Sequence, residues 1–244
     1  MPTPLRAHVQ VALEEVLLER LIGGGRGPTL RFWEWSERAL VLGSHQVLAN
    51  EVDRGAAGEL RFTVARRMSG GGTMVLEPGR SITYSLYAPE AVVSGLSFVG
   101  SFAFLDAWTV GCLRRLGAPA EHRPINDIVS PEGKIGGAAQ ARRRGFLVHH
   151  TAIAHEMEPD LVPRLLRLGR PRVSPRGVRS AEKTVSPLRR WLGLSRDEVV
   201  QALAGCFLES FPARFGSLSA EELAAAHALA AHKYATPEWI DRLH

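Results

Sequence analysis

The chain of 244 residues is long enough for one large domain, and its hydrophobic content of 45% supplies an ordinary soluble core. No apolar run approaches the roughly 20 residues that cross a bilayer, and the N-terminus lacks a signal-peptide core, so a membrane protein is excluded. The net charge of +5 favours anionic partners, but no helix-turn-helix, zinc-finger or RNA-binding motif accompanies it, and we expect no nucleic-acid partner.

Residues 7–22 predict an amphipathic helix. Apolar side chains recur there every three or four positions, with charged residues between them, and a run of glycines follows. Residues 30–35 and 39–43 are typical of two strands joined by a polar turn. Asn50 is a candidate cap for a short helix that reaches Ala57.

A glycine-rich loop (residues 66–73, sequence RRMSGGGT) connects a β-prone run at residues 60–65 with an alternating strand at residues 81–87. Glycine permits positive φ and lets a ligand approach the backbone, successive N–H groups can bind an anion, and arginine can hold a phosphate or carboxylate. The alternative is a loose hairpin loop with solvated arginines. The loop has neither a Walker nor a Rossmann pattern.

Residues 98–116 predict a second long helix, ended by Gly117. We expect its four aromatic side chains in the core: Phe98, Phe102, Phe104 and Trp108. Both cysteines, Cys112 and Cys206, fall in helical patterns, which argues against a disulfide framework. We expect them to be small, unpaired core residues in a reducing, cytoplasmic setting.

Residues 125–129, 134–140 and 145–153 predict three consecutive antiparallel strands. The small residues from Gly136 to Ala139 leave room for a ligand along the middle strand. Lys134, at the start of that strand, is a candidate for binding a phosphate or a polarised carbonyl. The alternative is a solvated hairpin lysine.

Asn126 and Asp127 lie one strand earlier and are candidates to face the same cavity. Asp127 could help to hold Mg²⁺, and the alternative is a polar group of a turn or bulge. His149 and His150 point to opposite faces of a strand, so at most one of them faces a pocket. Without further ligands at suitable spacing, a zinc site is not expected, and structural hydrogen bonds are the favoured role of each histidine.

From residue 159 the chain changes character. A helix-like run to Leu168 precedes a segment rich in proline and arginine (residues 169–190, the basic segment), which we expect to be a mobile loop or lid. Helices are predicted at about residues 195–211 and 219–232, each with a serine cap, and the aromatic tail is expected to dock on the body. The overall pattern predicts a single α+β domain, with a mixed or antiparallel sheet flanked by helices.

Several of these pieces resemble one known family in order and spacing. They are RRMSGGG at residues 66–72, NDI at 126–128, GKIGGAAQ at 133–140 and the histidine pair at 149–150. Together they are similar to the lipoate-protein ligase A family, part of the wider biotin/lipoate ligase and octanoyltransferase superfamily. KYATPEW at residues 233–239 resembles the end of that family's catalytic domain, so the resemblance covers nearly the whole chain.

The resemblance implies a catalytic domain that activates lipoate as an acyl-adenylate, using ATP and Mg²⁺, and transfers the acyl group to a lysine of a lipoyl domain. The acceptor would be a 2-oxoacid dehydrogenase E2 subunit or the glycine cleavage H protein. Lys134 would stabilise the charge that develops at the carboxylate–phosphate junction, with Asp127 near the metal. The basic segment would cover the adenylate or bind an acidic acceptor. The implied binding residues are Arg66, Arg67, Ser69, Gly70, Gly71, Gly72, Asn126, Asp127, Gly136, Gly137, Ala138 and His150.

Octanoyltransferase branches of the superfamily form a thioester on a cysteine, which in some lies near the position of Asn126 and Asp127, where this chain has none. That difference favours a ligase acting on lipoate or octanoate. The alternatives are an octanoyl-acyl-carrier-protein:protein octanoyltransferase and a non-catalytic homologue that binds lipoate or an adenylate.

The chain departs from the family's usual motifs at two places. Residues 76–80 read LEPGR instead of His-Asp-x-Gly-Asn, and His150 is followed by Thr151-Ala152 instead of Gly-Thr. The chain also ends without the accessory C-terminal domain of many full-length ligases. We therefore expect either a separate accessory small subunit or the loss of ligase activity.

Overall fold

Two β-sheets form the centre of the computed structural model, which describes residues 3–158 and 160–244. The larger sheet has six strands, each antiparallel to its neighbours. In spatial order they are β1 (Thr29–Trp33), β5 (Ser81–Pro89), β9 (Phe146–Ala154), β8 (Gly133–Arg143), β7 (Asp127–Ser130) and β6 (Glu121–Arg123).

The smaller sheet has β2 (Ala39–Leu42) at its centre, parallel to β3 (Thr63–Arg66) and antiparallel to β4 (Met74–Leu76). The predicted α+β class with a mixed or antiparallel sheet is therefore confirmed. β7, β8 and β9 are the three consecutive antiparallel strands that the sequence predicts.

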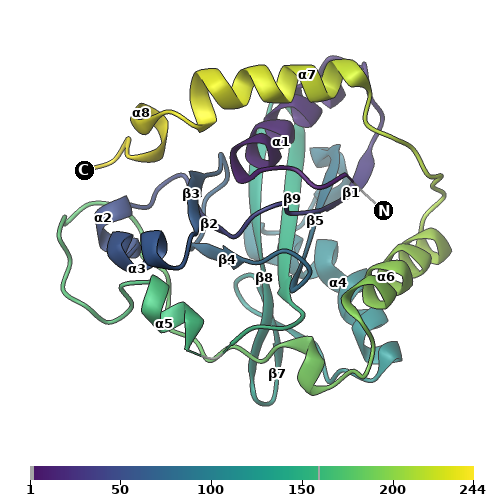
Figure 1. The fold of residues 1–244 in the computed structure, drawn as a ribbon. Helices are drawn as coiled ribbons and strands as arrows, with labels where there is room; N and C mark the ends of the chain where they lie inside the picture. Colours follow the sequence, from purple (N-terminus) through teal and green to yellow (C-terminus); the bar gives the residue numbers. More distant parts are fainter. Residues whose placement is uncertain (1–2, 159) are drawn as a thin grey trace.

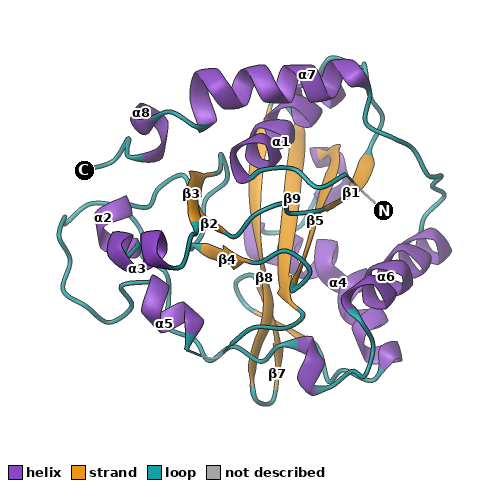
Figure 2. Ribbon diagram, in the orientation of Figure 1, coloured by secondary structure: helices purple, strands orange, loops and turns teal. Residues whose placement is uncertain are grey.

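Helices separate and cover the sheets (Figures 1 and 2). α1 (Ala7–Ile22) packs between the two sheets, and α7 (Ala220–Leu229) lies across it. On the opposite face of the larger sheet, α4 (Phe98–Leu116) packs against α6 (Arg196–Ser210). Three short helices cover the outer side of the smaller sheet: α2 (Leu48–Glu51), α3 (Arg54–Glu59) and α5 (Leu161–Leu165).

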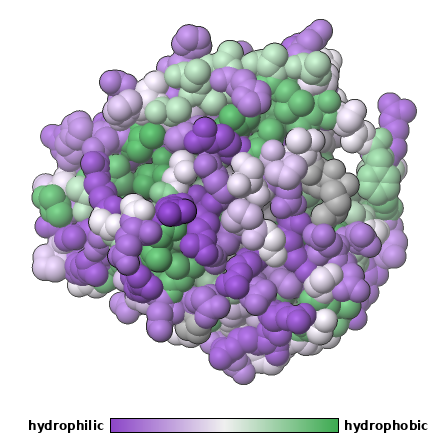
Figure 3. All heavy atoms as spheres, viewed as in Figure 1, coloured by the Kyte–Doolittle hydropathy of each residue, from purple (hydrophilic) through white to green (hydrophobic). Residues whose placement is uncertain are grey.

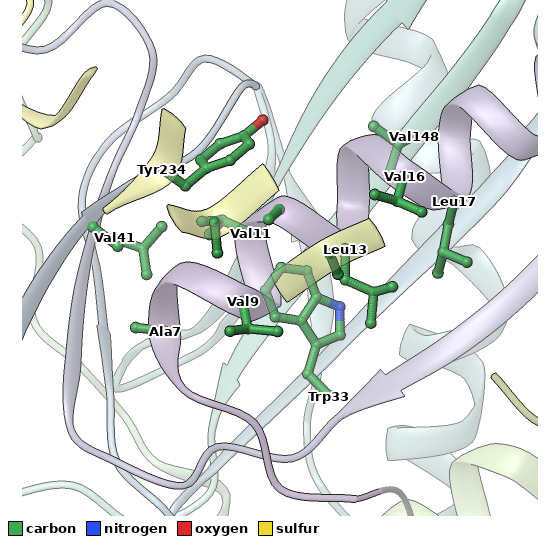
Figure 4. Packing of buried hydrophobic residues seen from close by; sticks show 14 of the residues in the cluster. Ala7, Val9, Val11, Leu13, Val16, Leu17, Trp33, Val41, Val148 and Tyr234 are labelled. Atoms are coloured by element: carbon green, nitrogen blue, oxygen red, sulfur yellow. The ribbon is translucent and has the colours of Figure 1, made fainter. Parts of the chain in front are cut away.

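The largest hydrophobic cluster surrounds α1, because almost every side of this helix is buried. Figure 4 shows Leu13 of α1 beside Trp33 of β1, with Val148 of β9 near Val16. Burying such side chains stabilises the fold by roughly 1.5–3 kcal/mol each. α1 therefore fixes the two sheets relative to each other.

The ends of the long helices follow the capping rules. Ser195 and Ser219 each form a complete capping box, with Glu198 and Glu222 respectively. Gly117 ends α4 with a φ of 106°, a conformation that favours glycine. The expected cap at Asn50 is wrong: Asp53 caps α3 by accepting a hydrogen bond from the Ala56 N–H.

Two expectations about α4 are also wrong. Phe98 and Phe104 are more than half exposed, because they lie off the buried stripe of this helix, whereas Phe102 is buried. Cys112 of α4 and Cys206 of α6 are buried as expected, but they form a disulfide across a sequence separation of 94. The expectation of a reducing, cytoplasmic setting therefore loses the support that unpaired cysteines gave it.

The tail docks on the body as expected. After a π-helical turn (Ala230–Tyr234), α8 (Pro237–Ile240) brings the Trp239 ring against Tyr234, with 5.3 Å between the ring centroids. Among the described residues, no helix is long and apolar enough to cross a membrane. Figure 3 shows polar residues over much of the middle and lower part of the face seen in Figure 1.

Candidate active site

Lys134, the predicted reactive lysine, forms an ion pair with Asp127 of β7. Its Nζ atom lies 2.8 Å from Asp127 Oδ1. Register pairs Asp127 with Gly137 of β8, and the Lys134 side chain folds back over that glycine. An ideal Cβ built on Gly137 would lie 2.6 Å from Lys134 Nζ, so only glycine leaves space for the ammonium group at this place.

A second lysine reaches the same carboxylate. Lys183 of the basic segment contacts the other carboxylate oxygen, Asp127 Oδ2. Burial alone would raise the pKa of Asp127, but the nearby ammonium groups of Lys134 and Lys183 lower it below its ordinary value. Asp127 is therefore an anion at neutral pH that is held between two cations.

This environment does not fit the expected role of Asp127 in binding Mg²⁺. Both of its oxygens are engaged by ammonium groups, whereas Mg²⁺ needs free oxygen ligands. Residues 3–158 and 160–244 contain no group of three or more His, Cys, Asp or Glu side chains arranged to hold a metal ion. We derive no metal-dependent step from these residues.

The glycine-rich loop lies between β3 and β4 and packs against the same strand, β8. Gly71 has a φ of 84°, and a Cβ at this position would lie 3.6 Å from the Cβ of Ala139. Gly43 touches the loop from the other side, since a Cβ there would lie 2.1 Å from the Gly71 carbonyl oxygen. The loop and the lysine end of β8 thus share one strand of small residues.

Arg66 and Arg67 are buried and hold the loop through main-chain carbonyls. The Arg66 guanidinium donates to the carbonyls of Gly43, Gln46 and Ile240. The Arg67 guanidinium donates to Val41, Gly70 and Gly72 carbonyls and to Ser69 Oγ. Burial lowers the pKa of each arginine to about 10. In this structure both arginines shape the loop; a direct contact with substrate stays a prediction.

Ser69 and His150 connect the loop to β9 and α1. Ser69 Oγ lies 3.0 Å from His150 Nε2, and His150 Nδ1 lies 2.8 Å from Glu14 Oε1. Burial would raise the pKa of Glu14, but His150, together with a hydrogen bond from Ser85, lowers it. Because Glu14 is a carboxylate and can only accept, His150 donates its Nδ1–H to Glu14, and its other ring nitrogen, Nε2, faces the Ser69 hydroxyl.

His149 faces the other side of the sheet, as the alternation along the strand predicts. Its Nε2 atom lies 2.8 Å from Asp106 Oδ1 of α4, which also accepts hydrogen bonds from Tyr84 and Thr151. Burial would raise the pKa of Asp106, but the contact with His149 lowers it. His149 thus lies in a buried hydrogen-bond network, the kind of role that the sequence favours for each of the two histidines.

The remaining predicted residues support the strands. The Asn126 side chain donates to the Ala138 carbonyl. A Cβ on Gly136 would lie 2.7 Å from the Ala152 carbonyl oxygen, so this glycine permits the close pairing of β8 with β9. A role for Asn126, Gly136 or Ala138 in binding substrate remains a prediction.

The basic segment lacks regular structure except for a short 3₁₀ turn (Leu188–Arg190), and polar side chains hold it in place. The Asn50 side chain hydrogen-bonds main-chain groups of Val173 and Ser174. Glu51 accepts from the N–H and hydroxyl of Ser180, whose Oγ accepts from the Thr73 N–H. The segment therefore covers the glycine-rich loop, and its mobility stays a prediction.

Sequence reasoning missed three residues of these networks: Glu14, Asp106 and Lys183. A signal existed for Glu14 and Lys183. Glu14 is a charged residue on the buried side of an apolar helix, and Lys183 is a rare lysine in an arginine-rich chain. Asp106 gave no clear signal, because a polar residue in a long helix usually faces solvent.

The chain is similar to two named proteins over almost its whole length. The chain is 30% identical over 261 residues to octanoyltransferase LipM of Kyrpidia tusciae, covering 96% of this chain and 94% of the relative. It is 26% identical over 251 residues to lipoate-protein ligase A subunit 1 of Thermoplasma acidophilum, covering 98% of this chain and 94% of the relative.

Solved structures show the same fold. A bi-partite lipoate protein ligase from T. acidophilum, studied with its E2 lipoyl domain, superposes with a TM-score of 0.81 at 25% identity, covering 100% of this chain and 95% of the other. A lipoate protein ligase from that organism with bound lipoic acid gives 0.80 at 26% identity, with coverages of 99% and 97%. A lipoate-protein ligase A bound with ATP gives 0.79 at 26% identity, with coverages of 100% and 97%.

The family described as the lipoyl protein ligase A/B catalytic domain matches residues 6–208. The matched region contains the glycine-rich loop, Asp127, Lys134, His150 and Lys183. The chain belongs to the lipoyl protein ligase A/B catalytic domain family.

Proposed function

We propose that this protein is an ATP-dependent ligase that activates lipoate or octanoate as an acyl-adenylate and transfers the acyl group to a lysine of a lipoyl domain. The observation that carries the proposal is the position of Lys134, whose ammonium group lies over Gly137. There it faces a strand of small residues beside a glycine-rich loop. Structural neighbours solved with lipoic acid and with ATP support both substrates.

In the first half-reaction, a carboxylate oxygen of the acyl substrate attacks the α-phosphorus of ATP, and pyrophosphate leaves. Negative charge increases on the oxygens at the new acyl–phosphate junction. The Lys134 ammonium group, held by Asp127, stabilises that charge as a fixed point charge. In this proposal the acyl chain binds along the small residues of β8, beside the glycine-rich loop.

In the second half-reaction, the amine of the acceptor lysine attacks the acyl carbonyl carbon. The carbon–oxygen bond to the phosphate breaks, AMP leaves, and the amine loses a proton as the amide forms. Lys134 again stabilises the negative charge, first on the carbonyl oxygen and then on the leaving phosphate. The basic segment shields the adenylate from water until the acceptor binds.

An octanoyltransferase is the second candidate, because the relative from K. tusciae carries that name. A thioester route needs a free thiolate, and both cysteines of the chain are joined in a disulfide between α4 and α6. Transfer through a covalent acyl-enzyme without ATP would require another nucleophile. Ser69, whose hydroxyl faces His150, is the candidate that the structure offers.

The proposed protein partners are a lipoyl domain as acceptor and an accessory subunit. The T. acidophilum relative is named as subunit 1 of a ligase, and its structural counterpart is bi-partite and was studied with an E2 lipoyl domain. This chain spans 94% of that relative. A second polypeptide is therefore part of our proposal for the complete reaction.

ATP–pyrophosphate exchange tests the adenylating half-reaction. Purified protein is assayed with Mg²⁺ and lipoate or octanoate, beside the variants Lys134→Ala and Arg214→Ala, the latter at an exposed position between α6 and α7. We expect exchange in the wild type and Arg214→Ala, and a loss of at least about 100-fold in Lys134→Ala, in line with the loss of one charge-stabilising group. Octanoyl transfer from acyl-carrier protein without ATP, abolished by Ser69→Ala, would instead support the second candidate.

A further inference from the structure

Lysine is rare in this chain. It occurs at positions 134, 183 and 233, although lysine and arginine together number 30. Two of the three lysines meet at one carboxylate, that of Asp127. An ammonium group is a compact point charge, whereas arginine presents a wide planar fork. Where nearly every other cation is arginine, the convergence of two lysines indicates a site that requires ammonium groups.

Main-chain contacts fix the position of Lys183. The Lys134 N–H donates to the Thr184 carbonyl at 2.8 Å, and the Ser186 N–H donates to the Lys134 carbonyl at 2.8 Å. Gly133 lies so close to this part of the basic segment that a Cβ would be 2.5 Å from the Thr184 carbonyl oxygen. Lys183 is therefore placed beside Lys134 by the backbone.

The three charged side chains differ in how far they are buried. The Asp127 side chain is 3% exposed, whereas those of Lys134 and Lys183 are 32% and 40% exposed. The carboxylate thus lies behind the two partly exposed cations. One carboxylate cannot neutralise two ammonium groups, and the nearby Glu132 is paired with Arg190. A positive charge is left over at the place where an anion can reach both lysines.

We propose that Lys183 is a second phosphoryl-binding residue of the reaction centre and that Asp127 positions both lysines. Together with Lys134, Lys183 binds the oxygens of the nucleotide phosphate that is attacked and later released. This inference rests on the proposed ligase function. A phosphoryl group has several oxygens and can accept hydrogen bonds from both ammonium groups at once.

The matched variants are Lys183→Ala, Lys183→Arg and Lys233→Ala. Lys233 is the appropriate control because it is also ion-paired, but to Glu15, and it lies over the Tyr234 and Trp239 rings. In ATP–pyrophosphate exchange, we expect Lys183→Ala to lower kcat/KM for ATP by at least 10-fold, and Lys183→Arg to restore part of it. The Kd for lipoate in Lys183→Ala and the kcat/KM of Lys233→Ala should stay within two-fold of the wild type.

Amine labelling provides a readout that does not depend on turnover. The wild type is treated with a lysine-reactive reagent with and without ATP, and the modified positions are mapped by mass spectrometry. ATP should protect Lys134 and Lys183 at least several-fold and leave Lys233 unchanged. Equal labelling of Lys183 with and without ATP would overturn the inference.

The two experiments separate this inference from the proposed function. Exchange by the wild type with an unchanged kcat/KM for ATP in Lys183→Ala would reject the role of Lys183 and keep the ligase. A wild type that neither exchanges nor binds ATP by calorimetry would reject both. Where ATP binds but exchange is absent, the affinity of Lys183→Ala for ATP decides: an unchanged Kd rejects the inference, and a weaker one supports it.

Discussion

The Oγ atom of Ser69 lies 3.0 Å from Nε2 of His150, across a sequence separation of 81. Behind this contact, His150 meets the buried carboxylate of Glu14. The glycine-rich loop is thus connected to the central helix α1 through one histidine of the larger sheet. The buried Glu14 carboxylate thus lies one contact away from the glycine-rich loop, on the opposite side of that histidine.

The lowered pKa of Glu14 should be visible in the pH dependence of the protein's stability. Its pKa in the folded protein is below the ordinary value of about 4.3 for glutamate. A lowered carboxyl pKa contributes stability above the unfolded value, and this contribution is lost as the pH falls through the folded value. In urea denaturation, Glu14→Gln should be less stable than the wild type at pH 7 and should lose less stability between pH 5 and pH 3. Parallel curves for the two proteins would contradict the prediction.

Gly137→Ala should lower the exchange activity strongly and change the stability of the fold only slightly. The new Cβ would occupy space within 2.6 Å of Lys134 Nζ, and the flexible lysine would move away. We expect a loss of about 10-fold or more in exchange activity, corresponding to about 1.4 kcal/mol of transition-state stabilisation, with a nearly unchanged Tm. The control is Gly111→Ala in α4, where a Cβ meets nothing within 4 Å and should raise stability by about 0.5–1 kcal/mol. Full activity of Gly137→Ala would show that the position of Lys134 is not critical.

Arg66→Met should strongly destabilise the protein. The guanidinium donates to the carbonyls of Gly43, Gln46 and Ile240, and its removal leaves these acceptors without the donor that satisfies them. Each unsatisfied buried group costs about 1–3 kcal/mol, so the loss in the free energy of unfolding should exceed about 2 kcal/mol. The exposed Arg176 supplies the control, because Arg176→Ala should change this free energy by less than about 0.5 kcal/mol. Equal stabilities of the two variants would contradict the scaffolding role of Arg66.

Replacing the disulfide should change stability and leave the chemistry intact. Cys112 and Cys206 lie between α4 and α6, in the hydrophobic cluster behind β7 and β8. The double variant Cys112→Ser/Cys206→Ser should lose about 2–4 kcal/mol of stability, the usual contribution of a disulfide. Its exchange activity below the unfolding transition should match that of the wild type. Complete loss of acyl transfer in a folded double variant would instead support a cysteine-dependent route.

Much of the fold could be predicted because its signals are local. The apolar periodicity of residues 7–22 and 98–116 matched the bounds of α1 and α4, and a glycine followed each helix. Alternation along β9 placed His149 and His150 on opposite faces. Strand β4 was missed because three residues are too few to show a period. The exposure of Phe98 and Phe104 was not predicted, because buried and exposed aromatic residues look alike in sequence.

The site was predictable only in part. Lys134 and the glycine-rich loop have distinctive local sequences, and the structure brings both to β8. The contact between Lys183 and Asp127 joins residues that are 56 positions apart, and no periodic pattern predicts it. The sequence suggested that Arg66 and Arg67 bind an anion. In the structure they donate to buried main-chain carbonyls, because such carbonyls need hydrogen-bond donors. Tertiary packing, which local sequence does not encode, explains these differences.

Arg66 is the first residue of the glycine-rich loop, and its side chain connects this loop to α8. The same guanidinium holds the Ile240 carbonyl and the turn at Gly43, and the Trp239 indole donates to the Arg66 carbonyl. These hydrogen bonds hold α8 and the glycine-rich loop together as one unit. An affinity tag, fluorophore or fusion joined after His244 would pull on this unit, whereas a surface attachment at Arg214, between α6 and α7, would leave it undisturbed.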